Sequence, residues 1–148
     1  MNRQTILHVE DDPNDVVLLE HAFRKAGVEC EIKRVADGEE AIAYLAGEEQ
    51  FADRQSFPIP GLILLDLKMP HLSGFDVLHW RRENEKMKAV PVVILSSSNH
   101  DVDLTRAYEL GVNSYLIKPV SFDALVGIVK ALSEYWLCPN TPALPSSA

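Results

Sequence analysis

The chain has 148 residues, the size of one ordinary domain, and a domain of this length buries roughly two-thirds of the surface that its unfolded chain exposes. Its composition, 47% hydrophobic and 24% charged, excludes disordered and fibrous classes of protein. The formal net charge of −8 opposes the phosphate contacts on which nucleic-acid binding depends, so no direct DNA binding is expected.

No apolar run approaches the roughly 20 residues that cross a bilayer, and the first residues lack a basic region followed by an apolar segment and cleavage site. We therefore expect a cytoplasmic protein with no membrane contact. Cys30 and Cys138 are too few for a disulfide framework and have no CxxC or histidine at metal-ligand spacing. We therefore expect both cysteines to be thiols and not members of a disulfide.

The first apolar run, ILHV at 6–9, is continuous, which is typical of a buried parallel strand. A helix is predicted to follow, with Pro13 in its first turn and Gly27 at its end. Asp12, directly before Pro13, is interpreted as the helix N-cap. The apolar positions of this helix recur at helical spacing: Val16, Leu19, Ala22, Phe23 and Ala26.

Residues 31–35 alternate in polarity, so they are predicted to form an edge strand. A helix is predicted over 38–46 and is closed by Gly47. Residues 48–60 then break the pattern with a polar stretch and two prolines. We interpret them as a surface insertion whose role the sequence does not indicate.

The second half continues the alternation. Buried strands are predicted at 62–67 and 91–95, and a weaker fifth strand at 114–118. One helix is predicted from about Gly74 through Arg81, and another over about 103–110, ending at Gly111.

A last helix is predicted to begin near Phe122, with an apolar stripe that indicates core packing: Leu125, Ile128, Val129, Leu132 and Trp136. The side chains of Tyr135, Trp136 and Leu137 lie where this helix runs out, and a neighbouring subunit could cover them. The tail at 138–148 has three prolines and no helix or strand signal. We expect no internal repeat and no attached output domain.

Five strand and helix alternations with short connections require a parallel sheet covered on both faces, because parallel strands need crossover helices and those crossovers are right-handed. The sequence thus predicts a doubly wound α/β fold with five strands and five helices. The chain is expected to be a single domain over 1–148, with a core at about 4–137.

In such sheets, ligands bind outside the carboxyl ends of the strands. The first predicted strand ends in Glu10 and Asp11, the third in Asp66 and the fifth in Lys118. The fourth ends in Ser96 and Ser97. We therefore expect acids, a hydroxyl and a cation to share one edge.

Carboxylates crowded together repel one another and raise one another's pKa unless a cation lies among them. Oxygen donors without histidine or cysteine favour a hard ion, so Mg²⁺ is predicted, with Mn²⁺ as an alternative, and no DxDxDG loop indicates Ca²⁺. Asp11 is assigned as a direct ligand and Glu10 as a ligand through water. Beside such a metal, Asp66 can attack a phosphoryl group to give an acyl phosphate while Lys118 offsets charge on the phosphoryl oxygens.

The segments HVEDDPND, ILLDLKMPHLSGFDVL, PVVILSSS and SYLIKP resemble the receiver domain of two-component response regulators, and the resemblance spans about residues 4–137. It implies a flavodoxin-like fold with strand order 2-1-3-4-5. It also implies a sensor histidine kinase as partner and a phospho-acceptor switch that catalyses only its own phosphorylation and dephosphorylation.

The resemblance carries site roles residue by residue. The phosphorylated aspartate corresponds to Asp66, and the metal shell to Asp11, Asp66, the main-chain carbonyl of Lys68 and, through water, Glu10. The switch hydroxyl corresponds to Ser96, with Ser97 as the second candidate, and the lysine before a cis-prolyl bond to Lys118. The aromatic switch corresponds to Tyr115, and the side chains of Lys68 and Ser98 are expected to tune hydrolysis.

The insertion at 48–60, the LSSSNH segment and the ending SEYWLCPNTPALP resemble the stand-alone receivers that serve bacterial phytochrome kinases. A phytochrome is thus one possible partner. Phosphorylation is expected to draw Ser96 toward the phosphoryl oxygens and turn Tyr115 inward. This would alter the face made by the fourth helix, fifth strand and fifth helix, which is also the candidate surface for a homodimer. The sequence does not identify the downstream protein.

Three rival functions make different demands on the sequence. A haloacid-dehalogenase-type phosphatase needs a second aspartate in a DxDxT motif, whereas this acceptor reads DLKMP. A nucleotide- or flavin-binding domain would need a GxGxxG or GxxxxGK[ST] loop, and neither is present. A phosphorylation-independent binding module stays open as an alternative, although every phosphorylation residue is present. No histidine is proposed as catalytic, and His8 is interpreted as a structural residue with its hydrogen bonds satisfied.

Overall fold

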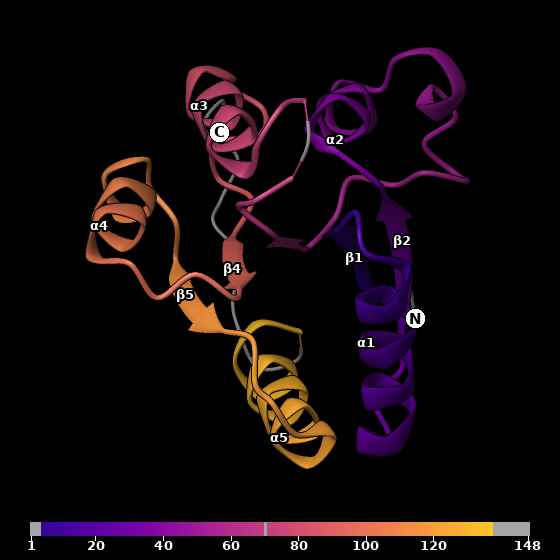
Figure 1. The fold of residues 1–148 in the computed structure, drawn as a ribbon. Helices are drawn as coiled ribbons and strands as arrows, with labels where there is room; N and C mark the ends of the chain where they lie inside the picture. The colour runs from indigo at the N-terminus through magenta and orange to yellow at the C-terminus, as the bar shows by residue number, and fades with distance from the viewer. Residues whose placement is uncertain (1–3, 70, 138–148) are drawn as a thin grey trace.

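The computed structural model of the chain describes residues 4–69 and 71–137. Its five strands form one parallel sheet in the order β2-β1-β3-β4-β5, which confirms the predicted topology (Figure 1). The strands are β1 Gln4–Val9, β2 Cys30–Val35, β3 Leu62–Leu65, β4 Val92–Ser96 and β5 Ser114–Ile117. Predictions for Cys138 and for the tail at 138–148 lie outside the described residues.

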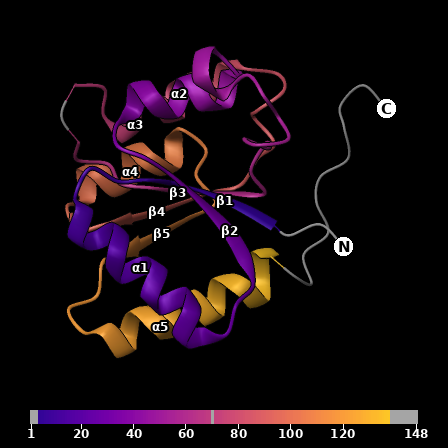
Figure 2. The same cartoon turned by 90° about the vertical axis from the view of Figure 1, so that its right-hand side faces the viewer.

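In the described part of the chain, five α-helices accompany the strands: α1 Pro13–Ala26, α2 Gly38–Ala46, α3 Gly74–Glu83, α4 Asp101–Glu109 and α5 Phe122–Leu132. Helices α1 and α5 cover one face of the sheet, and α2, α3 and α4 cover the other (Figure 2). The sheet is therefore buried on both sides. This explains why its central strands are continuous apolar runs instead of alternating ones.

Successive residues of the central strands enter two separate cores. Toward α2, α3 and α4 point Leu7, Val9, Ile63, Leu65 and Ile94. Toward α1 and α5 point Ile6, Leu62, Leu64, Val93 and Leu95. Because both faces of the sheet are packed in a core, the sheet is a rigid support for the loops at the carboxyl ends of its strands.

The ends of α1 follow from local capping signals. The Asp12 carboxylate accepts a hydrogen bond of 2.9 Å from the backbone N–H of Asn14, so Asp12 is the N-cap as predicted. Gly27 adopts a left-handed conformation with φ of 72° and ends the helix. Helix α2 is bounded in the same way by Asp37 and Gly47.

The segment at 48–60 is more structured than the sequence predicted. It contains a short 3-10 helix, η1 Glu49–Phe51, and the ring of Phe51 is buried. That ring lies 5.2 Å from those of Tyr44 and Phe57, so the insertion brings its own aromatic cluster to α2. The sequence of this segment has no helical or strand period, so the prediction missed its buried aromatic packing. That packing depends on contacts with α2, which the segment alone does not reveal.

Strand β3 ends at Leu65, two residues before its predicted end, and further departures concern α4 and the end of the chain. Helix α4 begins at Asp101, two residues before its predicted start. After α5, the chain continues as a π-helical turn, η2 Ser133–Leu137, in which Leu137 is buried in its own domain and Tyr135 is exposed. Of the three terminal residues expected to cover a neighbour, Leu137 thus packs inward. No helix within 4–69 and 71–137 is both long and apolar enough to span a bilayer.

Candidate functional site

The carboxyl ends of β1 and β3 lie side by side and bring two acidic residues together. The backbone N–H of Asp66 donates to the carbonyl of Val9 at 3.1 Å, and that of Glu10 donates to Val35 at 3.1 Å. At the carboxyl ends of β4 and β5, the backbone N–H of Lys118 donates to the carbonyl of Ser96 at 2.8 Å. The sheet hydrogen bonds therefore fix the backbones of these site residues.

Glu10, Asp11 and Asp66 form an acidic cluster in which one oxygen from each carboxylate lies within 4.8 Å of the others. Glu10 is only 1% exposed and Asp66 only 6%, whereas Asp11 is more open to solvent. The guanidinium of Arg34 donates to the main-chain carbonyls of Glu10 at 3.1 Å and Asp11 at 3.4 Å. Arg34 thus fixes the loop that carries two of the three acids.

Burial is the main cause of the raised pKa of Glu10 and of Asp66. It raises the pKa of Glu10 to about 7, opposed by the hydrogen bond from Lys118 and reinforced by the charge of Asp66. Burial also raises the pKa of Asp66, although the Lys118 charge opposes this. An oxygen-only set of crowded, desolvated carboxylates suits a hard divalent cation, since such an ion removes their mutual repulsion.

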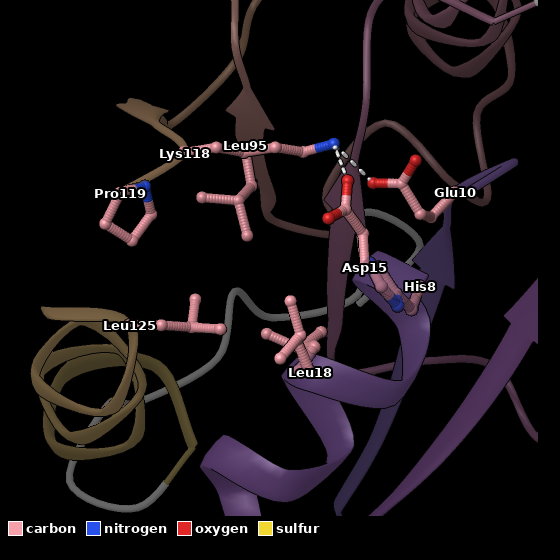
Figure 3. A pocket seen from close by; sticks show the side chains of 9 residues that line it. His8, Glu10, Asp15, Leu18, Leu95, Lys118, Pro119 and Leu125 are labelled. Carbon is pink, nitrogen blue, oxygen red and sulfur yellow. Dashed lines mark hydrogen bonds and ion pairs between the residues drawn. The ribbon is translucent and has the colours of Figure 1, made fainter. Parts of the chain in front are cut away.

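The Lys118 ammonium faces three carboxylates. It lies 2.7 Å from Glu10 Oε1 and 2.8 Å from Asp15 Oδ2 (Figure 3). Its distance to Asp66 Oδ2 is 3.8 Å. Burial by itself would lower the pKa of Lys118, but the bonds to Asp15 and Glu10 and the charge of Asp66 outweigh it and raise the pKa. The ammonium is thus charged and held at the acidic cluster.

Asp15 was not among the predicted site residues. It lies in the first turn of α1, and its carboxylate is one of the two closest partners of Lys118. The available signal was its place in DDPND, one turn after the strand-end acids. Helical position alone could not show that its side chain faces the fifth strand.

Gly74, at the start of α3, allows the chain to fold back over Asp66. A β-carbon at Gly74 would collide with the main-chain carbonyl oxygen of Asp66 and approach Leu67 too closely. The backbone N–H of Gly74 donates to the carbonyl of Leu67 at 3.1 Å. Only glycine therefore fits here without displacement of the loop that presents Asp66.

Ser96 is fully buried at the end of β4, whereas Ser97 is exposed. The Ser96 hydroxyl oxygen accepts a hydrogen bond of 3.2 Å from the backbone N–H of Ser98. The half-buried Tyr115 donates its hydroxyl to the Ser98 carbonyl at 2.9 Å. Ser96, not Ser97, is thus the hydroxyl that this loop encloses.

The backbone of Lys68 lies beside the Asp66 carboxylate, whereas its side chain points toward α4. Its N–H donates to Asp66 Oδ1 at 3.4 Å, while its ammonium lies 3.0 Å from Asp103 Oδ2 on α4. The Asp103 carboxylate also accepts a hydrogen bond of 2.6 Å from the Ser98 hydroxyl. These two contacts, with the Ser98 bond the larger contribution, lower the pKa of Asp103.

A cavity of about 50 Å³ lies beside Lys118, between α1 and α5. Figure 3 shows Leu18 and Leu125 on its apolar side, with Asp15 and Glu10 toward the lysine. His8 also lines it, and its buried Nδ1 has no hydrogen-bond partner among residues 4–69 and 71–137. The prediction that His8 is fully satisfied is wrong, because the ring is enclosed within the core.

Burial, with smaller effects from the charges of Lys118 and Arg34, lowers the pKa of His8 to about 3. The imidazole is therefore neutral. No peptide bond within the described residues is cis, so the Lys118–Pro119 bond is trans, the lower-energy form of an X–Pro bond, and not the cis form that the resemblance implied.

A doubly wound parallel sheet with an acidic cluster and a lysine at its carboxyl edge defines a class of α/β domains whose site lies at the ends of the strands. The response regulator receiver domain matches residues 6–130, and the chain belongs to this family. It is therefore a receiver domain of two-component signalling.

The chain is 40% identical to the probable methanogenesis regulatory protein FilR2 of Methanothrix harundinacea over 132 residues, which are 89% of this chain and 83% of that protein. It is 34% identical to response regulator Rcp1 of Synechocystis, over 97% of this chain and 95% of Rcp1.

Among solved structures, the phosphorylated cyanobacterial phytochrome response regulator RcpA matches with a TM-score of 0.88 and 36% identity. The match covers 97% of this chain and 100% of the RcpA chain. A Mn²⁺-bound form of Rcp1 matches with a TM-score of 0.83 and 33% identity, over 95% and 99%. The chain thus resembles stand-alone receivers of phytochrome systems.

Proposed function

We propose that this receiver accepts a phosphoryl group on Asp66 from the phosphohistidine of a sensor kinase. The observation that carries the proposal is the convergence of Glu10, Asp11 and Asp66 within 4.8 Å of one another, with the Lys118 ammonium beside them. In the transfer, an Asp66 carboxylate oxygen forms a bond to phosphorus while the bond from phosphorus to the histidine nitrogen breaks. The products are an acyl phosphate and a neutral imidazole.

The residues that would hold Mg²⁺, or Mn²⁺ in its place, are Asp11, Asp66 and the Lys68 carbonyl, with Glu10 acting through water. A bound divalent ion would neutralise charge on the phosphoryl oxygens and the carboxylates. The Mn²⁺-bound form of Rcp1 and the oxygen-only donor set support this assignment. Lys118 supplies the second positive charge.

After transfer, the Ser96 hydroxyl turns toward the phosphoryl oxygens, and Tyr115 turns inward. The present hydrogen bonds that join Ser96 to Ser98 and Ser98 to Tyr115 support this coupling, because movement of one residue disturbs the next. Lys68 and Ser98 are placed to tune hydrolysis of the acyl phosphate. The altered face comprises α4, β5 and α5, and binds a protein.

The kinase partner we propose is a phytochrome, since RcpA, a cyanobacterial phytochrome response regulator, resembles this chain over its whole length. We propose one domain over 1–148, a switch without activity on other substrates, and no direct DNA binding. A cytoplasmic location and homodimerisation stay predictions.

The test is incubation with acetyl phosphate and Mg²⁺ followed by intact mass. The wild type is expected to gain one phosphoryl group, Asp66→Asn none, and Asp123→Asn, a surface aspartate in the first turn of α5, the same as the wild type. Without Mg²⁺ the gain is expected to disappear. A wild type that gains no mass would favour the phosphorylation-independent binding module.

A further inference from the structure

Ser98 is a junction whose three polar groups each contact a different element. Its N–H donates to Ser96 Oγ at 3.2 Å, and its carbonyl accepts from the Tyr115 hydroxyl at 2.9 Å. Its own hydroxyl donates to Asp103 Oδ2 at 2.6 Å. A shift of Ser98 therefore disturbs β4, β5 and α4 together.

Asp103 extends this junction to the acceptor residue. The same oxygen that accepts from Ser98 lies 3.0 Å from the Lys68 ammonium, and the Lys68 N–H donates to Asp66 Oδ1 at 3.4 Å. A continuous chain of polar contacts thus runs from Asp66 through Lys68, Asp103 and Ser98 to Tyr115. It reaches the tyrosine without passing through Ser96.

The two contacts of Asp103 differ in strength. The Ser98 hydroxyl and the Asp103 side chain are both buried, so their short hydrogen bond is shielded from water. The Lys68 side chain is 57% exposed, and an ion pair with one such partner is weak and easily exchanged. The Lys68 contact is therefore the one that a new anion can break.

We propose that Asp103 is a positioning residue that holds the Lys68 ammonium away from the phosphoryl site of Asp66 and fixes Ser98 against α4. This inference rests on the proposed function. A phosphoryl group on Asp66 carries about −1.5 to −2 charge and competes with Asp103 for that ammonium. Loss of the Lys68 contact leaves Asp103 and Ser98 free to move, which releases α4 and Tyr115.

The test compares rates of phosphorylation by acetyl phosphate and Mg²⁺, followed by intact mass. Asp103→Asn keeps the size and an acceptor for the Ser98 hydroxyl but loses the charge that holds Lys68. We expect phosphorylation about three- to tenfold faster than in the wild type, because a freed ammonium beside the site favours an anionic donor.

Two further variants separate this mechanism from simple charge effects. Asp101→Asn removes the same charge from the same first turn of α4, at an exposed residue, and is expected to react like the wild type. In a Lys68→Met background, Asp103→Asn is expected to bring no gain. Equal rates for Asp103→Asn and Asp101→Asn, or a gain that persists without Lys68, would overturn the proposal.

A second experiment tests the link from Asp103 to Ser98 and Tyr115, by measuring amide NMR signals of the unphosphorylated protein. Asp103→Ala removes both contacts, so the Ser98 and Tyr115 signals are expected to move toward their positions in the phosphorylated wild type; unchanged signals contradict the proposal. A wild type that takes up no phosphoryl group would overturn the proposed function as well. A wild type that is phosphorylated, beside Asp103 variants that match Asp101→Asn, would overturn this inference alone.

Discussion

Glu10 is a buried carboxyl whose pKa is raised from 4.5 to about 7, chiefly by burial, so it makes metal-free stability depend on pH. Between these values the folded chain binds more protons than the unfolded chain, and the free energy of unfolding falls as pH rises. Glu10→Gln removes this titration. At pH 8 in EDTA we expect the variant to be about 1–3 kcal/mol more stable than the wild type, with the difference gone below about pH 4.5.

Urea unfolding at both pH values measures the difference. Glu20→Gln, an exposed residue of α1, is the matched control and is expected to follow the wild type. A gap between Glu10→Gln and wild type that is the same at pH 4.5 and pH 8 would show that burial of the Glu10 charge is not its cause.

At the scale of elements, Arg54 joins the insertion to α2. Its guanidinium donates to the carbonyls of Tyr44 at 2.8 Å, Leu45 at 2.8 Å and Phe57 at 3.2 Å. The last turn of α2 has no basic residue of its own, so Arg54 satisfies its carbonyls and carries the favourable charge. Arg54→Ala is expected to lower the free energy of unfolding by about 1–3 kcal/mol.

Thermal and urea unfolding test this, with Arg24→Ala as control. Arg24 is exposed in the last turn of α1, and the loss of its charge removes no described tertiary contact to a carbonyl. Arg54→Lys is expected to fall between wild type and alanine, because an ammonium cannot reach all three acceptors. An Arg54→Ala protein as stable as Arg24→Ala would mean that the insertion does not support α2.

The elements that the sequence predicted well are those with local signals. Asp12 and Gly27 mark the two ends of α1, and both could be predicted because their capping contacts lie within a few residues. The acids at the strand ends meet because parallel strands share a carboxyl edge. Asp15 and Asp103 were missed because a helical side chain reaches the site only through the way its helix packs. The role of Arg54 depends likewise on contacts made between elements.

At the scale of the whole molecule, the face formed by α4 and β5 exposes apolar side chains to solvent. On α4 and β5, Val102 is 76% exposed, Tyr108 50% and Ile117 45%, and β5 is an edge strand. A groove of about 500 Å³ runs beside β5 and α5, with Tyr135 and Trp136 among its lining residues. Such a face, next to an unpaired strand edge, favours association with a second surface of the same kind.

We therefore expect the protein to dimerise through this face when phosphorylation moves α4 and Tyr115. Sedimentation equilibrium with beryllofluoride and Mg²⁺ is expected to give a dimer, and Ile117→Glu a monomer, because a charge buried at the contact lacks a partner. Val17→Glu places the same charge on α1, where the valine is 49% exposed, and is expected to leave the dimer intact. Since both variants add one negative charge, a loss of dimer in both would point to general repulsion. A wild type that is monomeric in both states would exclude the dimer and leave the face to a different protein.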